Sequence, residues 1–206
     1  MPQVAYNLEP IVGVPGMPFS PAGSNVVESR PALLSAGVAF GTAVELVVSG
    51  GVEYVQQLQD SGTTTSFLPA LLGVAVWDPA REQALPVQGG TSSSGIQTYS
   101  GYAQYEMVPV MRSGTIYVQT DSVTQQASWA NAWPSLGQVL VWHSSDGTHA
   151  QGVFTMLAAS ATAGAEIDEC PTSIIGRDPS RQVTYTNGWG ATFGVAVVEL
   201  NLPGTT

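Results

Sequence analysis

The feature of this sequence that most constrains its fold is a pair of alternating apolar segments joined by two glycines. Residues 43–49 read AVELVVS and residues 52–58 read VEYVQQL, with Gly50 and Gly51 between them. Val44, Leu46 and Val48 lie two residues apart, which is the period of a strand with one buried face. Because consecutive glycines tolerate the positive φ angles of a tight turn, the segment predicts an antiparallel β-hairpin.

Other apolar segments of strand length recur along the chain. They are LLGVAVW at 71–77, QYEMVPVM at 104–111, GTIYVQT at 114–120, QVLVWH at 138–143, GVFTML at 152–157, QVTYT at 182–186 and ATFGVAVVELNL at 191–202. A turn is expected near Ser113 and Gly114, and Pro109 places its strand at a sheet edge or a bulge. Asn187 and Gly188 predict a further hairpin turn.

The spacing of these segments predicts an all-β fold, a compact β-barrel or β-sandwich. Helix signals are weak: residues 122–132 have a possible cap at Ser122 and a stop at Pro134, so we expect at most one short helix. A chain of 206 residues suits one large domain. We therefore expect a single β domain over 26–206, with a flexible loop at about 83–103 where glycine and serine are frequent.

The first 25 residues are expected to form an extended arm. They contain five prolines, which oppose a helix and a central strand, and also apolar side chains such as Val12, Val14, Met17 and Phe19. Those side chains need covering, either by the domain that follows or by a neighbouring subunit. The sequence leaves both alternatives open.

Charge limits the partners that the chain can have. It has no lysine, five arginines and fifteen carboxylates, for a net charge of −10. The arginines are scattered and the net charge repels phosphate, so nucleic acid is not an expected partner. No apolar run approaches the roughly 18 residues that span a bilayer, so no membrane association is expected either. The N-terminus lacks a signal-peptide pattern, which indicates synthesis in a reducing cytoplasm.

The same composition argues against an enzyme. Without lysine there is no Schiff-base, P-loop or S-x-x-K chemistry, and no G-x-S-x-G motif occurs. The single Cys170 follows Glu166, Asp168 and Glu169, and neighbouring anions disfavour the reactive thiolate. A β-sandwich hydrolase with two distant carboxylates remains an alternative that sequence alone does not exclude.

No metal or other cofactor is expected. His143, Asp146 and His149 lie in WHSSDGTH, but a four-residue turn at 144–147 would put the two imidazoles on opposite faces of a hairpin. A five-residue loop would bring them together. The acidic EIDE stretch at 166–169 lacks the ligand spacing and central glycine of a calcium loop.

Two groups of aromatic residues are candidates for binding. Trp129 and Trp133 would share one face of a helix and could anchor an interface, although core packing is the commoner use of such a pair. Tyr99, Tyr102 and Tyr105 are predicted to be surface aromatic residues close to the flexible loop, where they suit the stacking of sugars. They support an alternative function, a glycan-binding or host-surface-binding module of a virion fibre or tail.

The order of these segments resembles that of the structural cement, or capsid decoration, proteins of tailed bacteriophages. The resemblance rests on an arm with Tyr6, Pro10 and Gly16-Met17, on FGTAVEL from Phe40, LLGVAVWD from Leu71, GYAQYEMVPVMRSGTIYV from Gly101 and GVAVVEL from Gly194. It implies a non-enzymatic β protein on the outer face of the major capsid protein lattice, where it bridges capsomers and stabilises the shell.

The same resemblance directs attention to interface residues. The candidates for partner contact are Tyr6, Pro10, Met17 and Phe19 in the arm, together with Trp129 and Trp133. The expected partner is the major capsid protein, bound by a homodimer or a homotrimer on the capsid. The chain departs from the family pattern in residues 83–101 and in the tryptophan segment before Pro134.

Overall fold

The fold was analysed in a computed structural model, which describes residues 14–18, 25–58, 71–79, 87–92, 95–99, 101–120, 140–142, 151–155, 167–169, 174–176, 183–186 and 192–202. The regular elements within these residues are all strands, so the all-β prediction is confirmed. The strands are β1 (Val26–Pro31), β2 (Val38–Ala39), β3 (Ala43–Ser49), β4 (Val52–Gln57), β5 (Leu71–Ala75), β6 (Val87–Ser92), β7 (Gly95–Tyr99), β8 (Gly101–Tyr102), β9 (Met107–Thr120), β10 (Leu140–Trp142), β11 (Phe154–Thr155), β12 (Ile167–Glu169), β13 (Ile174–Gly176), β14 (Val183–Thr186) and β15 (Thr192–Asn201).

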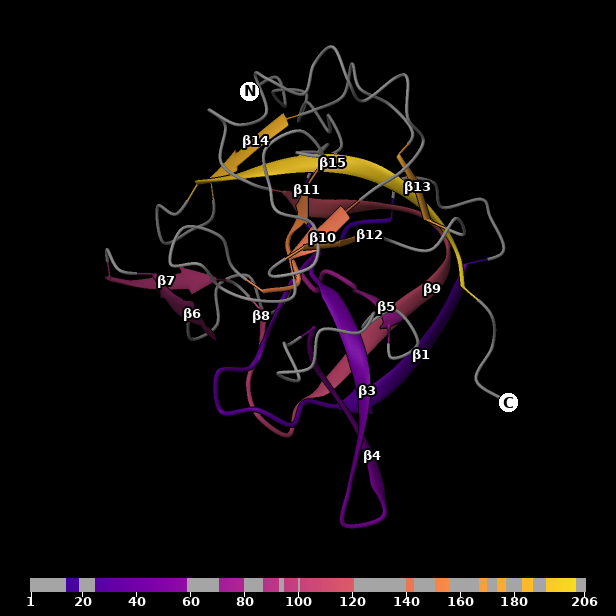
Figure 1. Ribbon diagram of the computed structural model, residues 1–206, viewed down its shortest axis with the longest axis vertical. Coiled ribbons are helices and arrows are strands. Elements are labelled where there is room, and N and C mark those ends of the chain that lie inside the picture. Colours follow the sequence, from indigo (N-terminus) through magenta and orange to yellow (C-terminus); the bar gives the residue numbers. More distant parts are fainter. Residues whose placement is uncertain are drawn as a thin grey trace, which may run out of the picture.

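Most of these strands belong to one sheet, in which β9 is the central element (Figure 1). Along its main path the order is β12-β10-β11-β9-β5-β3-β4, with β1 and β15 also pairing with β9. The pairs are antiparallel except for the contact of β11 with β9, which is parallel. Two separate pairs complete the described strands, β2 with β8 and β6 with β7.

Three predicted hairpins or strand pairs are confirmed by these pairings. β3 and β4 pair from Val44 with Gln57 to Ser49 with Val52, around Gly50 and Gly51. β10 pairs with β11, and β14 pairs with β15. The β6–β7 pair lies inside the segment 83–103. The predicted flexibility of that segment and the domain boundaries stay predictions.

The predicted turn near Ser113 and Gly114 is wrong, because β9 runs through both residues as one strand. Ser113 pairs with Val26 of β1 and also with Asn201 of β15, so the strand changes partner there. Gly114 has a φ of +119°, which only glycine adopts readily. The glycine therefore bends the strand instead of reversing the chain.

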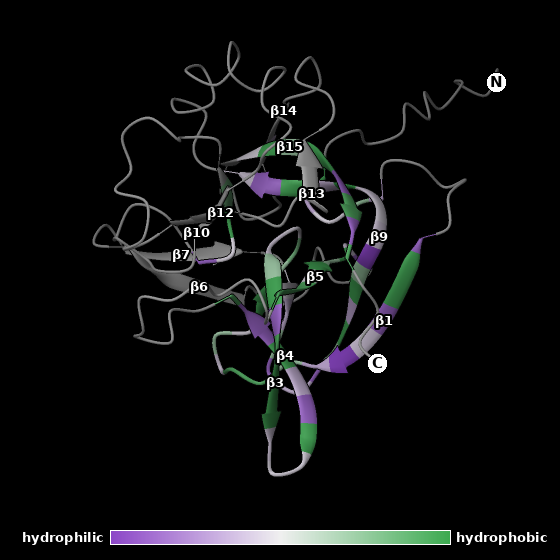
Figure 2. Cartoon of the chain, turned by 45° about the vertical axis from the view of Figure 1, so that its right-hand side comes forward, coloured by the Kyte–Doolittle hydropathy of each residue, from purple (hydrophilic) through white to green (hydrophobic). Residues whose placement is uncertain are grey.

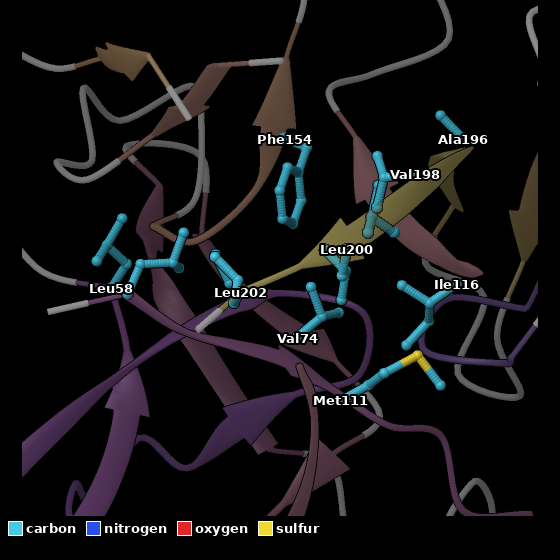
Figure 3. Packing of buried hydrophobic residues seen from close by; sticks show 12 residues of the cluster. Leu58, Val74, Met111, Ile116, Phe154, Ala196, Val198, Leu200 and Leu202 are labelled. Atoms are coloured by element: carbon cyan, nitrogen blue, oxygen red, sulfur yellow. The ribbon is translucent and has the colours of Figure 1, made fainter. Parts of the chain in front are cut away.

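The buried side chains form two large clusters on opposite faces of β5 and β9. The first contains Ala43, Leu58, Leu71, Val74, Met111, Ile116, Val118, Phe154, Ala196, Val198, Leu200 and Leu202. The second contains Ala32, Val38, Phe40, Val44, Val55, Leu72, Ala75, Tyr102, Val108 and Val110. In Figure 3, Phe154 of β11 and Met111 of β9 point toward the region of Val74 and Leu200.

A bulge in β5 explains how this strand serves both clusters. Val44 pairs with Gly73, whereas the next residue, Glu45, pairs with Leu71, so Leu72 is an extra residue on β5. Leu71 and Val74, which are three positions apart, consequently both lie in the first cluster. Burial on both faces also accounts for the nearly continuous apolar sequence of this strand.

Candidate interaction surface

Residues 14–18 of the predicted arm are fixed to the edge of β9. Gly16 N–H donates to the Tyr117 carbonyl at 2.7 Å, and Tyr117 N–H donates to the Met17 carbonyl at 3.0 Å. Trp77 N–H donates to the Gly16 carbonyl at 2.9 Å, and Pro18 forms a bridge with Ile116. The two bonds with Tyr117 and the bridge with Ile116 use backbone groups of β9 that lie between its contacts with β5 and β11.

The apolar side chains of residues 14–18 are covered by the chain's own domain, which is one of the two alternatives that the sequence left open. Val14 is buried, and Met17 is half-buried against a third apolar cluster formed by Tyr117, Val195 and Val197. Tyr6, Pro10 and Phe19 lie outside the described residues. The contact role predicted for these three residues and for Met17 stays a prediction.

Six large apolar side chains in the described part of the chain are exposed, each between 46% and 66%. They are Val26, Val27, Val48, Val52, Tyr105 and Met107. Val26 and Val27 begin β1, at a bulge opposite Ser113 and Met111. The other four lie at the tip of the β3–β4 hairpin or in and after the turn at 103–106, and we call these four residues the hairpin end.

The hairpin leaves the body of the protein, and its side chains become exposed in order. Val44, Leu46 and Val48 share one face of β3 and are buried, half-buried and exposed respectively. A Cβ atom added to Gly50 or Gly51 would meet nothing within 4 Å. Figures 1 and 2 show the hairpin projecting beyond the other strands, so its tip is free to reach a second molecule.

The two exposed valines lie on opposite faces of this ribbon. Val48 pairs with Glu53 and Ser49 pairs with Val52, and directly paired residues project to the same face. Val48 and Val52 therefore project to opposite faces. The six residues from Val47 to Val52 carry no charge, in a chain with a net charge of −10.

The turn at 103–106 holds Tyr105 in a strained conformation. Its φ is +65°, and it is the one non-glycine residue with positive φ in the described part of the chain. Tyr105 N–H donates to the Ala32 carbonyl at 2.8 Å, and Ala103 N–H donates to Glu106 Oε2 at 2.8 Å. An exposed ring on a strained backbone is a frequent sign of a functional position.

Backbone and side-chain bonds join this turn to the base of the hairpin. Gln104 Nε2 donates to the Leu33 carbonyl at 2.8 Å, and Leu33 N–H donates to the Val55 carbonyl at 2.9 Å. Ala32 also forms a parallel bridge with Val55 of β4. The turn and the hairpin thus lie at one end of the molecule and are held there together.

A chain of ion pairs ties β9, β1 and β4 to one another behind this end. Arg112 Nη1 lies 2.8 Å from Glu28 Oε1, and Arg30 Nε lies 2.9 Å from Glu53 Oε2. Arg30 Nη2 also lies 3.3 Å from the other carboxylate oxygen of Glu28. Both arginines in the described residues are therefore engaged in ion pairs.

Among the aromatic candidates, the prediction that Tyr102 is a surface residue is wrong. Its side chain is 1% exposed, its ring meets Phe40 edge to face at 5.2 Å, and its hydroxyl donates to the Val76 carbonyl at 2.8 Å. Tyr105 is 65% exposed, as predicted. Of Tyr99 only the strand is described, so its side chain remains untested.

The pairing of β10 with β11 does not match the four-residue turn at 144–147, on which the expected placement of His143 and His149 depended. A four-residue turn would pair Val141 with Ala150, whereas Val141 pairs with Phe154 and Leu140 with Thr155. The connection is therefore longer than that turn, and the argument that placed the imidazoles on opposite faces does not apply. His143, Asp146 and His149 themselves lie outside the described residues.

Three of the remaining candidate residues fall in segments that the structure does not describe. Trp129, Trp133 and Cys170 lie outside the described residues. Within the described part of the chain, histidine, cysteine and carboxylate side chains form no group of three that could hold a metal. No helix there is long and apolar enough to cross a membrane.

The described residues form an all-β fold with exposed apolar side chains at one end, and comparison with known families gives the class of protein. The sequence model of the family described as structural cement protein (E217 gp24/Pam3 gp6) matches residues 1–201. No curated protein matches the chain. The chain belongs to the phage structural cement protein family, so the resemblance stated above is confirmed.

Membership in this family establishes the general role. The protein is a structural component of the bacteriophage virion that stabilises the capsid and associates with capsid proteins. Its place is the virion capsid, and the family is in general non-enzymatic.

Val48, Val52 and Met107 were not identified as candidate contact residues from the sequence. The exposure of Val48 and Val52 depends on how far the hairpin extends beyond the core, and the alternation of apolar residues does not show this distance.

Proposed function

We propose that this protein binds the outer face of the lattice formed by the major capsid protein, bridges neighbouring capsomers and stabilises the shell. The observation that carries the proposal is the family match over residues 1–201. The net charge of −10 and the absence of lysine support a place outside the shell, because the inner face meets packaged DNA. Synthesis in the host cytoplasm, before assembly, completes the proposal.

On the capsid we expect a homodimer or a homotrimer. Each weak contact is then repeated by symmetry, and a bound copy holds the next at high effective concentration. Sedimentation of the free protein, compared with its stoichiometry on purified particles, distinguishes the two assemblies.

The experiment that tests the proposal mixes purified protein with unexpanded and expanded capsids that lack it. Co-sedimentation with one or both forms is expected, with density on the outer surface between capsomers in electron cryomicroscopy. Particles with bound protein should also resist heat or osmotic rupture better than bare particles. Absence of binding to both forms contradicts the proposal.

The predicted contact residues form part of this proposal. Tyr6, Pro10, Met17 and Phe19 in the arm and Trp129 and Trp133 are proposed to contact a capsid protein or a second copy. Trp129→Ala and Trp133→Ala separate an interface role from a core role. An interface role predicts lost assembly with an unchanged melting temperature, whereas a core role predicts a lower melting temperature.

The glycan-binding alternative retains one specific observation, the exposed ring of Tyr105. Tyr102 no longer supports this alternative, because its side chain is buried and cannot stack on a sugar. A glycan array decides between the two functions: binding that Tyr99→Ala or Tyr105→Ala abolishes, together with no affinity for capsids, would favour the alternative.

A further inference from the structure

The tip of the β3–β4 hairpin has a shape and an apolar pattern that a flat contact would not satisfy. Val48 and Val52 are 66% and 47% exposed on opposite faces of the ribbon. To remove both side chains from water, a partner must enclose the tip from two sides. A groove in the partner does this, whereas a flat surface covers one face only.

We propose that the tip of the β3–β4 hairpin, with Val48 and Val52, inserts into an apolar groove of the capsid protein, and that Tyr105 and Met107 cover the rim of that groove. This inference rests on the proposed function and adds to it the surface that makes the contact. The residues from Val47 to Val52 carry no charge. The carboxylate that borders the tip is Glu53, which pairs with Val48 on the same face and already forms an ion pair with Arg30.

The rigidity of Tyr105 supports its role beside the hairpin. Bonds from Ala103, Gln104 and Tyr105 to Glu106, Leu33 and Ala32 hold the backbone of the turn, so the position from which the ring projects is set before a partner arrives. Preorganised exposed aromatic side chains lose little entropy on binding and are frequent hot spots. A turn selected for stability alone would carry glycine or asparagine at a φ of +65°.

Capsid protein fits this surface better than a second copy of the chain. A two-fold contact of hairpin against hairpin would bury one face of each tip and leave the other valine in water. A two-fold contact of each hairpin with a different surface of the other copy is the outcome that the self-association measurement detects. Family membership requires a contact with capsid proteins, and the hairpin projects beyond the other described strands (Figure 2).

The test compares two matched pairs of substitutions. Val48→Thr with Val52→Thr keeps the shape and strand preference of valine but adds a hydroxyl that an apolar groove leaves unpaired. The control is Val26→Thr with Val27→Thr, the same change at two equally exposed valines of β1. The first pair should weaken binding to capsids by about tenfold or more, and the control pair should change it less than about twofold.

A second variant, Tyr105→Asn, keeps the test valid if the hairpin pair misfolds. Asparagine tolerates positive φ, so the melting temperature should be unchanged or higher while capsid affinity falls by about tenfold. A residue with a purely structural role would not separate stability from affinity in this way.

The outcomes distinguish this inference from the function on which it rests. If the wild-type protein does not bind capsids, the proposed function fails and the inference fails with it. If wild type binds and the hairpin variants bind equally well, only the inference is overturned. Loss of self-association in solution, with capsid binding intact, would assign the hairpin to a second copy and also overturn it.

Discussion

The backbone of Gly16 crosses the backbone of Gly41 so closely that neither residue has room for a side chain. A Cβ atom on Gly16 would lie 2.6 Å from Trp77 N and 3.0 Å from Gly41 N, and one on Gly41 would lie 2.7 Å from Gly16 N. Both residues have positive φ angles. This crossing fastens the described part of the arm to the segment that precedes β3.

Gly16→Ala is therefore expected to destabilise the protein strongly. The added methyl group meets backbone atoms that belong to hydrogen-bonded segments, and alanine is also strained at a φ of +83°. Together the two effects should lower the free energy of unfolding by about 3–5 kcal/mol, measured by urea denaturation.

Gly51→Ala is the matched control for this substitution. Gly51 has a φ of +80°, but a Cβ atom there meets nothing within 4 Å. Only the backbone strain remains, so the expected cost is about 1 kcal/mol. Equal effects of the two substitutions would show that the arm is not held at this crossing.

The ion pairs behind the hairpin end should differ in strength according to burial. Glu28 and Arg112 side chains are 21% and 7% exposed, whereas Glu53 is 51% exposed. Glu28→Gln removes the negative charge that lies 2.8 Å from the buried guanidinium of Arg112 and should cost about 1–3 kcal/mol. Glu53→Gln should cost about 0.5 kcal/mol or less, because water already screens that pair.

Salt provides the check on this interpretation. The Arg30–Glu53 contribution should vanish at about 1 M NaCl, while most of the effect of Glu28→Gln should persist, because screening acts weakly on buried pairs. Thermal melts of the two variants at low and high salt measure the difference. The same loss for both variants at high salt would contradict it.

Much of the strand pattern could be predicted because local rules and tertiary packing agree there. The hairpin at Gly50 and Gly51 is specified by alternation and by turn residues alone. At Gly114 the local signal was the same, a glycine between two apolar segments, but pairing with β1 and then β15 keeps the chain extended. Sequence identifies the residue that needs a positive φ, and distant partners decide whether the chain turns.

The site was less predictable, because exposure is a property of the whole fold. Val48 continues the same alternation as Val44, which is buried, and no local feature marks where the hairpin leaves the core. Tyr102 and Tyr105 are three residues apart in a similar sequence context, yet one lies in the second cluster and the other in solvent. Their different roles follow from pairing with β2 and from the turn, which are tertiary features.

This contrast between the two tyrosines gives a further prediction. Tyr102→Phe removes the hydroxyl that donates to the Val76 carbonyl and leaves that oxygen without the bond, while the packing against Phe40 is kept. The expected cost is about 1–2 kcal/mol in the free energy of unfolding. Tyr105→Phe removes the same atom from a ring that is 65% exposed, where water replaces the interaction, and should change stability by less than about 0.5 kcal/mol. Urea denaturation of both variants measures the difference, and a cost for Tyr105→Phe as large as that for Tyr102→Phe would contradict the assignment of Tyr102 to the core and Tyr105 to the surface.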